Sequence, residues 1–534
     1  MKKRLSILLL LAGMVPMSCT DKFDDLNTDP TKSSSTTFDP NLLLPSIQWK
    51  HVSATAGYSG AILFQSMWVQ ILASTTSGAA NYYSNADKYV ISSNTNSYLA
   101  STWNGDYSAA SFAYEMEQLA KDKPALANLM NIAVIMQVQS LATISDVYGD
   151  MPYTEALKAK AAITLPVYDT QESIYKSLLT RLDAATAALD ASKPLATNDA
   201  FAGYKGDVAK WKKYGYSLML KLAMRLVKID PATAKTYAEK AAAGGTFASM
   251  SDDAYVSGDD TNGYTNGNGA ALSTPADVYQ VRWSKTMIDY LKSTNDPRLG
   301  VIAEVPVAGL AGNQGVAAGN SDPAVQLGLP NGYDLNGGAT DISKSPGYNG
   351  ASGTGADITP IGKYSRPASI YRGRSAPIFV LTYAETELLL AEAATRGFSV
   401  GATTAAAHYK NAVSAGIQTL GRYGTTAAIS AGVADAYAAA NPLVTADALK
   451  QINEQYWVVN GTLFNFVEAW NNWKRSGYPV LTPVNYVGNF SGGVIPRRQI
   501  YPTGEATLNG ANYNAAIGKL SGGDKWSSRI WWDK

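Results

Sequence analysis

Apolar residues recur with a helical period along most of the chain, and this pattern restricts the fold more than any other feature. Between Ala125 and Ile144 they form one broad face, and Gly149 and Pro152 then break the helix. The same period recurs in the segments 171–189 and 208–229, and a short Ala-rich helix is expected at 232–243. The residues expected to be buried by the 208–229 helix include Trp211, Leu218 and Leu222. The pattern predicts a mostly helical protein.

The C-terminal half repeats this design. The segment Pro377–Arg396 is expected to be a helix that ends at Gly397, and Thr403–Leu420 is expected to be its partner. Small residues stand where paired helices must approach closely, so the pair resembles a tetratricopeptide helical hairpin. The segment Asp447–Asn472 is a further helical region and is rich in aromatic residues.

Two long stretches interrupt the helical pattern. Residues 250–283 and 301–372 are rich in Gly, Asn, Asp, Ser, Pro and Tyr, a composition typical of long loops. Loops of this length are uncommon in a compact domain and are often functional. No linker that separates independent domains is recognisable after residue 40, so we expect one large domain at 41–534.

The N-terminus has the features of a secretory signal followed by a lipid attachment site. Basic residues precede an apolar run, Leu5–Val15, which is shorter than the ~20 residues that a membrane span needs. Ser18 and Cys19 follow, as in a lipobox, and Cys19 is the only cysteine of the chain. We expect a signal peptide at 1–18, a lipid on Cys19 and a polar tether at 19–40. No later stretch is expected to cross a membrane.

The charge balance points away from nucleic acid. Lys and Arg number 44 and Asp and Glu number 43, which gives a net charge of +1. A nucleic-acid-binding protein normally carries a basic surface. We therefore expect no nucleic-acid partner.

Signatures of catalysis are few. The chain holds two histidines, His51 and His408, which is too few for the usual zinc sites. The HExxH, G-x-S-x-G, Walker A and G-x-G-x-x-G motifs are absent. No catalytic residue is therefore assigned, and no cofactor is expected. A carboxylate pair of the glycosidase kind stays open, because any acid-rich chain contains possible pairs.

Calcium is the one metal that the sequence leaves possible. Asp252, Asp253, Asp259 and Asp260 stand close together, and Ca²⁺ prefers clustered oxygen ligands. The spacing does not match an EF-hand loop, and a polar turn explains the cluster more simply than a calcium site does.

Aromatic residues in polar, Gly-rich segments are the best candidates for ligand binding. A ring can stack on the apolar face of a sugar while neighbouring Asn, Asp and Gly groups bond its hydroxyls. The candidate ligand-binding residues are Tyr82, Tyr83, Tyr264 and Trp283. The next candidates are Tyr333, Tyr348 and Tyr364, from the 301–372 stretch. The alternative is that these rings pin the loops to the helical core.

Several longer motifs occur in a characteristic order. They are Ser18-Cys19 followed by DDLN (24–27), DVYGDMPYTEAL (146–157), WKKYGYSLMLKLAMRL (211–226), NDPRL (295–299), LTYAETELLLAEAATRG (381–397), FVEAWNNWKRSGYPVL (466–481), IPRRQIYPTGEATLNGANYNAAI (495–517) and the terminal WWDK. Together they resemble the SusD/RagB-like outer-membrane nutrient-binding lipoproteins, and within them the SusD-like, starch-binding branch.

This resemblance implies both a fold and a function. The implied fold is mostly α, with tetratricopeptide-like hairpins forming an α-α superhelical scaffold and with long inserted loops that build the ligand face. The implied function is that of a lipid-anchored outer-membrane protein, facing the cell exterior, that binds a glycan and delivers it to a TonB-dependent transporter barrel of the SusC type. Such a protein is not an enzyme.

Two alternatives remain. The same scaffold could bind peptides or another nutrient, or it could act as a surface glycoside hydrolase. Binding of an oligosaccharide without turnover separates the first role from a hydrolase.

Overall fold

The computed structural model describes residues 38–75, 82–91 and 95–534. The chain forms two compact units, Met1–Pro40 and Asn41–Lys534, and the described α-helices and β-strands lie in the second. The expected signal peptide, Cys19 and the tether up to residue 37 lie outside the described residues. Lipidation therefore stays a prediction.

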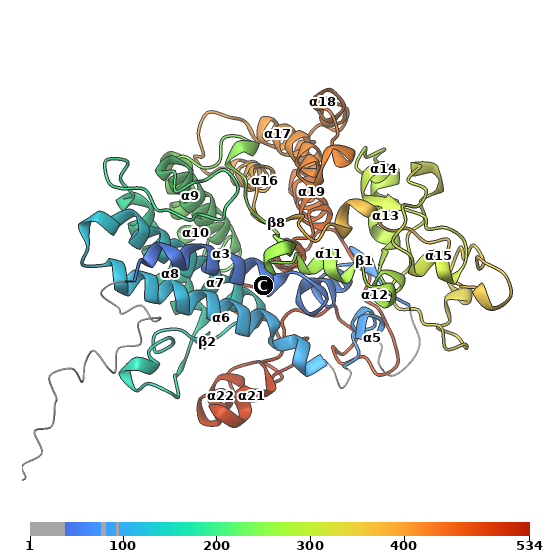
Figure 1. Cartoon of the computed structure of the whole chain (residues 1–534), viewed down its shortest axis with the longest axis horizontal. Coiled ribbons are helices and arrows are strands. Elements are labelled where there is room, and N and C mark those ends of the chain that lie inside the picture. The colour runs from blue at the N-terminus through green and yellow to red at the C-terminus, as the bar shows by residue number, and fades with distance from the viewer. Residues whose placement is uncertain (1–37, 76–81, 92–94) are drawn as a thin grey trace, which may run out of the picture. The chain divides into compact units, whose positions relative to one another are not determined.

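Helices that follow one another in the chain pack side by side in the first half of the second unit (Figure 1). They are α3 (Leu43–Thr55), α6 (Thr95–Ala120), α7 (Ala127–Tyr148), α8 (Gln171–Ala188), α9 (Val208–Arg225) and α10 (Pro231–Gly244). Each helix from α6 to α10 contacts the next one. This arrangement is the α-α superhelical scaffold that the sequence predicted.

A second set of helical pairs continues the scaffold in the C-terminal half. It consists of α16 (Tyr383–Thr395), α17 (Ala405–Gln418), α18 (Ala431–Ala440), α19 (Ala448–Thr462) and α20 (Phe466–Ser476). Helix α16 packs against both α17 and α19, and it also contacts α9. The contact between α9 and α16 joins the two halves into one helical body.

Side-chain caps explain where several helices begin. Thr170 accepts a hydrogen bond from the backbone N–H of Ser173 at the start of α8, and Asp207 caps α9 in the same way. At the other end of α16, Gly397 has a φ of 79°, which lies in the left-handed region that favours glycine. The predicted helix 171–189 and the predicted end of the 377–396 helix follow from these local signals.

One predicted helix boundary was wrong. The stretch Pro377–Leu381 forms strand β8, and α16 begins only after the cap residue Thr382. Every residue of β8 is buried, so this continuous apolar run belongs to a strand covered on both faces. The predicted helical region 447–472 is confirmed and consists of two helices, α19 and α20, separated where Phe464 adopts a left-handed φ of 59°.

Short antiparallel strand pairs tie the loop stretches to the helices. Strand β1 (Leu72–Ala73) pairs with β5 (Arg282–Trp283), β2 (Met151–Pro152) with β3 (Tyr168–Asp169), β4 (Ala254–Ser257) with β8, and β6 (Ala303–Glu304) with β7 (Arg366–Pro367). The stretches 250–283 and 301–372 thus contain more regular structure than their composition suggested. Because the β1–β5 and β4–β8 pairs join distant segments, they fix the 250–283 stretch at defined points.

Short helices complete the second unit. They are α4 (Gln65–Trp68), α5 (Tyr82–Asp87), α11 (Gly267–Ala271), α12 (Pro275–Gln280), α13 (Lys285–Ser293), α14 (Leu299–Ile302), α15 (Leu310–Gln314), α21 (Thr503–Leu508) and α22 (Gly510–Ile517). Figure 1 places α11 to α15 together with the loops between residues 250 and 372, beside the C-terminal helices of the scaffold. We call the stretches 250–283 and 301–372, with α5 and the segment 480–494, the loop region.

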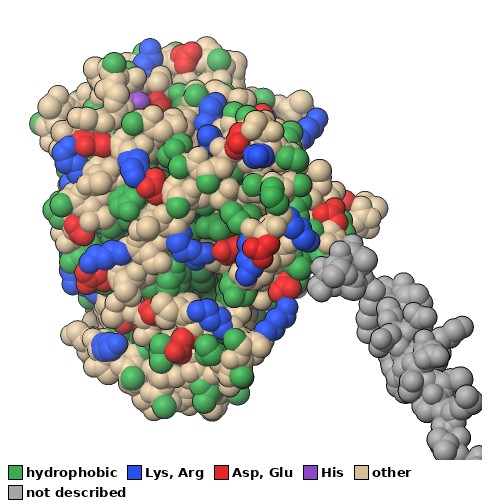
Figure 2. Space-filling view, turned by 90° about the vertical axis from the view of Figure 1, so that its left-hand side faces the viewer, with side chains coloured by type: hydrophobic (Ala, Val, Ile, Leu, Met, Phe, Trp, Pro, Cys, Tyr) green, Lys and Arg blue, Asp and Glu red, His purple; other side chains and the backbone are tan. Residues whose placement is uncertain are grey.

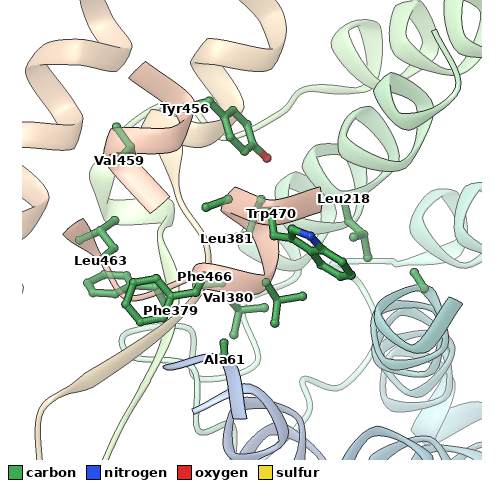
Figure 3. Close-up of a cluster of buried hydrophobic side chains, with 14 of the residues drawn as sticks. Ala61, Leu218, Phe379, Val380, Leu381, Tyr456, Val459, Leu463, Phe466 and Trp470 are labelled. Atoms are coloured by element: carbon green, nitrogen blue, oxygen red, sulfur yellow. The ribbon is translucent and has the colours of Figure 1, made fainter. Parts of the chain in front are cut away.

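The scaffold core matches the sequence prediction. Trp211, Leu218 and Leu222 are all buried, as expected. Figure 3 shows Leu218 in a cluster with side chains from α19, β8 and α20, among them Trp470. Truncation of a buried leucine in such a core costs about 2–5 kcal/mol.

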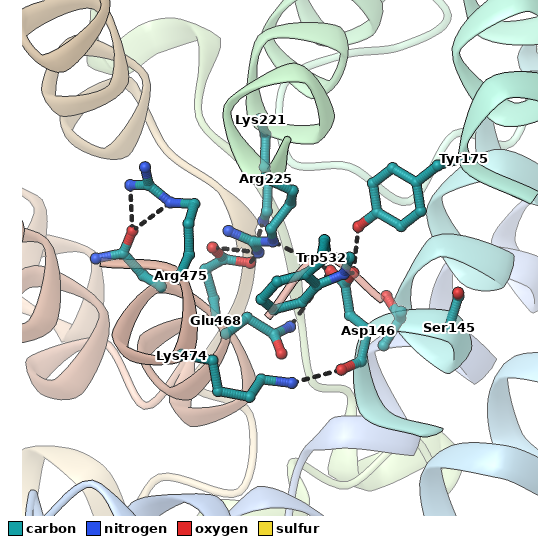
Figure 4. Close-up of polar contacts among 12 residues, drawn as sticks. Ser145, Asp146, Tyr175, Lys221, Arg225, Glu468, Lys474, Arg475 and Trp532 are labelled. Atoms are coloured by element: carbon teal, nitrogen blue, oxygen red, sulfur yellow. Dashed lines mark hydrogen bonds and ion pairs between the residues drawn. The ribbon is translucent and has the colours of Figure 1, made fainter. Parts of the chain in front are cut away.

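A buried network of charged residues also crosses the scaffold (Figure 4). The guanidinium of Arg225 on α9 donates to both carboxylate oxygens of Glu468 on α20, each at 2.6 Å. Lys221 lies 3.0 Å from Glu468 and 3.0 Å from Glu385 of α16, and Arg225 also reaches Asp146 of α7 at 3.3 Å. Four helices therefore meet around charges that compensate one another.

The charge of Glu468 depends on these partners. Burial alone would raise the pKa of its carboxyl, but the neighbouring Arg225 and Lys221 lower that pKa from 4.5 to about 2. Glu468 is thus an anion across the physiological pH range. A buried ion pair of this kind is costly to break, because the remaining charge has no water to solvate it.

One helix of the scaffold is apolar enough to resemble a membrane span. The segment Pro124–Tyr148, which contains α7, is long and apolar enough to cross a membrane by length and composition alone. The sequence predicted no such segment after the N-terminus. In the fold, 72% of its most apolar window is buried inside the protein. The helix therefore has the burial of a core helix.

Charges on the outer surface are mixed. Figure 2 shows acidic and basic side chains interspersed on the face that lies at the left of Figure 1. Exposed ion pairs of the scaffold include Lys176 with Glu172 on α8, and Lys240 of α10 with Asp183 of α8. This face carries no large area of a single sign.

Candidate ligand-binding site

Two of the four predicted ligand-binding rings are part of the core. Tyr83 and Trp283 both have exposed fractions of 0%. The indole N–H of Trp283 donates to the backbone oxygen of Ile302 at 3.0 Å, and its ring packs against Tyr371 and Phe464. The expectation that Tyr83 and Trp283 are open to a ligand is therefore corrected. Neither ring has a solvent-exposed face on which a ligand could stack.

The pairing of β5 explains why Trp283 is buried. Trp283 stands opposite Leu72 of β1, more than 200 positions earlier in the chain. The polar composition of the 250–283 stretch indicated a loop, whereas this strand pair places the ring inside the scaffold. Local sequence does not contain the partner strand, so the burial was not predictable from it.

Tyr264 is exposed, as predicted, and packs against the scaffold. Its side chain is 49% exposed, and its ring meets Trp49 of α3 edge-on, with the centroids 5.3 Å apart. Tyr82 is the first residue of α5, and its side chain lies outside the described part of the structure. Of the described rings among the four, Tyr264 is the one that a ligand can reach.

The side chains of the acidic cluster at 252–260 bind other groups of the protein. Asp252 binds Lys213 at 3.0 Å, Asp253 accepts the backbone N–H of Tyr383 at 2.7 Å, and Asp260 pairs with Arg374. Within the described residues, no group of three or more His, Cys, Asp or Glu side chains could hold a metal ion. These residues do not fit a calcium site.

The two histidines are buried beside carboxylates. His51 lies 2.7 Å from Asp106, and His408 lies 3.1 Å from Glu387. Both pairs link neighbouring helices of the scaffold, so they contribute to packing.

A surface pocket of about 460 Å³ opens in the loop region. Its lining comes from Gln70, the start of α13, the turn that begins at Pro330, residues 339–340 and the segment 482–485. The lining residues are Gln70, Lys285, Thr286, Asp289, Pro330, Asn331, Gly332, Tyr333, Ala339, Thr340, Thr482, Pro483, Val484 and Asn485. We call this the loop-region pocket. Its size suits a ligand of a few sugar rings.

Gln70 fixes the base of this pocket. Its side-chain amide donates to the backbone oxygen of Thr482 at 2.6 Å and accepts from the hydroxyl of Thr286 at 2.9 Å. It therefore bridges two walls that belong to distant parts of the chain. Gln70 also has a φ of 51°, a conformation that is unfavourable for a residue other than glycine and persists only where the surroundings hold it.

Tyrosine rings from the secondary candidates gather beside the pocket. A small hydrophobic cluster, separate from the main core, has partly buried Tyr333 and Tyr348 packed against it, and Tyr364 is one of its buried members. Because Tyr333 also lines the pocket, its ring combines a packed edge with an accessible surface. This is the arrangement that stacking on a sugar requires.

The pocket carries no net charge. Its lining contains one cation and one anion, Lys285 and Asp289, and these two form an ion pair on α13. The other polar groups of the lining are amides and hydroxyls, which bond neutral hydroxyl or acetamido groups well. The pocket is therefore suited to an uncharged polar ligand.

The segment 482–485 was missed by sequence reasoning. It follows α20 as Thr-Pro-Val-Asn and has no aromatic residue or motif that marks a site. Its role comes from the fold, which places Val484 directly against Gly332.

A family model described as starch-binding and associating with the outer membrane matches residues 32–502. The chain belongs to the SusD-like family. The resemblance noted in the sequence is thereby confirmed, and so is the helical fold that it implied.

Solved structures of SusD-like proteins superimpose on nearly the whole chain. One, titled a chitin-binding protein, is 29% identical, with a TM-score of 0.77 over 93% of this chain and 100% of the other. A chitin-binding SusD homologue from Flavobacterium johnsoniae is 23% identical, with a TM-score of 0.72 over 93% and 98% of the two chains. A SusD homologue from Bacteroides uniformis is 23% identical, with a TM-score of 0.70 over 94% and 100%. No curated protein matches the chain.

Proposed function

We propose that this protein binds a neutral oligosaccharide at the outer membrane of a bacterium and passes it to a transporter for import. The observation that carries the proposal is the family match over residues 32–502, whose description combines starch binding with association with the outer membrane. The 29% identical relative titled a chitin-binding protein supports a glycan as the ligand.

The loop-region pocket is the proposed ligand site. Tyr333 supplies a ring for stacking, and Asn331, Thr340 and Asn485 supply neutral hydrogen-bonding groups. Because the Lys285–Asp289 pair cancels its own charge, the pocket favours uncharged sugars over uronic acids or sulfated glycans. Tyr264 and Tyr82 remain additional ligand-binding candidates.

Binding without turnover is the second part of the proposal. A glycosidase of the common kind needs two carboxyl groups on either side of the scissile bond. Among the described lining residues of the pocket, Asp289 is the single carboxylate, and it is paired with Lys285. This supports a binding protein over the hydrolase alternative.

The ligand proposal is tested by isothermal titration calorimetry with maltohexaose and chitohexaose, set against polygalacturonate and a mixture of short peptides. We expect binding of a neutral oligosaccharide that is recovered unchanged after prolonged incubation. Binding of the peptides alone would contradict the glycan proposal, and release of shorter sugars would support the hydrolase alternative.

Membrane attachment is proposed to depend on the lipid at Cys19. The Cys19→Ser variant should be absent from the outer-membrane fraction, because a soluble domain without its lipid has no anchor. Normal retention of this variant at the cell surface would contradict the proposal.

Delivery to a SusC-type transporter is proposed from the family resemblance. Affinity purification of the lipid-anchored protein from solubilised outer membranes should recover a TonB-dependent barrel in near-stoichiometric amount. Recovery of the protein without any barrel would contradict this part of the proposal and leave the ligand proposal unaffected.

A further inference from the structure

Three consecutive residues at the end of α5 connect the walls of the loop-region pocket. We call Asp87, Lys88 and Tyr89 the α5 clamp. Their side chains are buried, with exposed fractions of 0%, 2% and 0%. None of them lines the pocket, yet each contacts a segment that does or that lies beside it. The clamp therefore connects α5 to parts of the chain that the sequence places far away.

Asp87 holds the turn at Asn331 and Gly332. One carboxylate oxygen accepts the backbone N–H of Gly332 at 2.6 Å, and the other accepts the side-chain amide of Asn331. That amide also donates to the backbone oxygen of Leu72 at 2.9 Å. Both oxygens of Asp87 are thus committed to the residues that immediately precede Tyr333.

Lys88 and Tyr89 hold the opposite wall. The ammonium of Lys88 lies 5.6 Å from the ring centre of Tyr486, whose hydroxyl donates to Asp334 at 2.5 Å. The hydroxyl of Tyr89 accepts the backbone N–H of Val484 at 3.4 Å, and its backbone oxygen accepts that of Phe490 at 2.7 Å. The segments that begin at residues 330 and 482 are therefore connected through α5.

The two walls of the pocket are also in direct contact, where Gly332 packs closely against Val484. Gly332 has a φ of 88°, and a Cβ atom there would lie 2.7 Å from a methyl group of Val484. Tyr89 has a φ of 58°, which is unfavourable for an aromatic residue. Residues in such conformations persist only where several contacts determine them together.

We propose that Asp87 is a positioning residue for ligand binding, which orients Tyr333 and the pocket wall by holding the Asn331–Gly332 turn without touching the ligand. The proposal rests on the proposed function for the identity of the ligand. The property that matters is the pair of acceptor oxygens. Without them, the N–H of Gly332 and the amide of Asn331 lose their buried acceptor, and the turn is free to take other conformations.

Two substitutions of Asp87 separate positioning from general stability. Asp87→Ala removes both acceptors and should weaken oligosaccharide binding about tenfold or more. Asp87→Asn keeps one acceptor for the N–H of Gly332 and should restore binding to within about threefold of the wild type. Asp341→Ala is the matched control, since Asp341 belongs to the same loop but accepts hydrogen bonds only from Gly337 and Ser343 at the exposed surface.

The measurements are calorimetric titration with maltohexaose and chitohexaose, and amide hydrogen exchange of the ligand-free protein. In Asp87→Ala we expect faster exchange in peptides covering 330–341, with the scaffold helices unchanged. Wild-type affinity in Asp87→Ala, or unchanged exchange at 330–341, would overturn the inference. If Asp87→Ala does not fold, Asp87→Ser replaces it with the same expected directions, because one short hydroxyl cannot serve both the N–H of Gly332 and the amide of Asn331. Unchanged binding and exchange in Asp87→Ser would overturn the inference equally.

The inference and the proposed function can fail separately. If the wild type binds neither oligosaccharide, the proposed function fails, and the exchange experiment still decides whether Asp87 holds the wall. If the wild type binds but Asp87→Ala binds equally well, the function stands and the positioning role is excluded.

Discussion

Buried acids occur in both the helical scaffold and the loop region, but in different surroundings. In the scaffold, Glu468 lies between Arg225 and Lys221, both within hydrogen-bonding distance. In the loop region, the carboxylate of Asp87 is bound mainly by neutral donors, the N–H of Gly332 and the amide of Asn331. The scaffold acid is thus paired directly with two cations, whereas the loop acid is hydrogen-bonded by neutral groups and only neighbours a cation, Lys88, which lowers its pKa.

This difference teaches what each region is built for. Opposite charges from four helices fix the relative positions of those helices. Removing one of these charges leaves another buried charge unpaired and destabilises the folded protein. Neutral hydrogen bonds to a turn fix only that turn, at a lower energetic cost when they are lost. A ligand site can therefore change in the loop region while the scaffold stays the same.

The largest expected effect comes from breaking the scaffold network. Arg225→Leu leaves the carboxylates of Glu468 and Asp146 without their guanidinium and should lower the free energy of unfolding by about 3–5 kcal/mol. Urea unfolding followed by circular dichroism measures this change. At temperatures where the variant is folded, its oligosaccharide affinity should equal that of the wild type.

The matched control for this prediction is Lys176→Met, which breaks the exposed Lys176–Glu172 pair on α8. An exposed pair is screened by water, so the free energy of unfolding should not change measurably. Equal destabilisation by both variants would contradict the contrast between buried and exposed charges.

The second prediction uses pH to distinguish the two acids. Arg225 and Lys221 lower the pKa of Glu468 against the effect of burial, from 4.5 to about 2, so its stabilising contribution is complete above pH ~4.5 and is lost as the pH falls toward 2. Burial raises the pKa of Asp87 from 3.8 to about 6, although Lys88 lowers it in part. Its charged form therefore costs stability above pH ~6, and protonation relieves this cost between about pH 6 and 4.

The melting temperature measured across pH 3 to 8 tests these signs. Asp87 should make stability rise as the pH falls from about 6 toward 4, and Glu468 should make it decrease as the pH falls from about 4.5 toward 2. Asp87→Asn should reduce the rise and leave the acid-side decrease in place. The nearest titratable neighbours of Asp87 are Lys88 and Tyr89, which belong to the same clamp. If stability rises with acidification in Asp87→Asn as much as in the wild type, other titratable groups cause the rise.

The smallest expected effect is a change in ligand affinity alone. Tyr333→Ala should lower affinity by about 0.5–1.5 kcal/mol, or roughly two- to tenfold, because one stacking ring is lost. Calorimetric titration measures this loss. Tyr237→Ala, which removes a similarly half-buried ring from α10 of the scaffold, is the control and should leave affinity unchanged. A larger loss of affinity in the control would place the ligand elsewhere.

Local patterns predicted much of the scaffold. The helices α7 to α10 follow from the period of their apolar residues, and caps such as Thr170 and Asp207 set their starts. The strand β8 was mistaken for helix because a short, continuous apolar run has no period that separates the two structures. The break between α19 and α20 follows directly after Gly461, and the sequence prediction left this helical region undivided.

The candidate site was predicted only in part. The sequence singled out Tyr333, which does line the pocket, among its secondary candidates. It also singled out Tyr83 and Trp283, which are buried. An aromatic ring in a polar segment is equally able to stack on a sugar or to anchor the segment, and the choice depends on what packs against it.

The sequence by itself determined the helical scaffold, its buried leucine and tryptophan faces and its family, because these depend on residues close together in the chain or on the order of motifs. Only the tertiary structure decided which rings stay exposed and where the pocket lies. Asp87 meets Gly332 across 245 positions, and Tyr89 meets Val484 across 395. Contacts of this range leave no periodic signal in the sequence, because each one is determined by the packing of the whole chain.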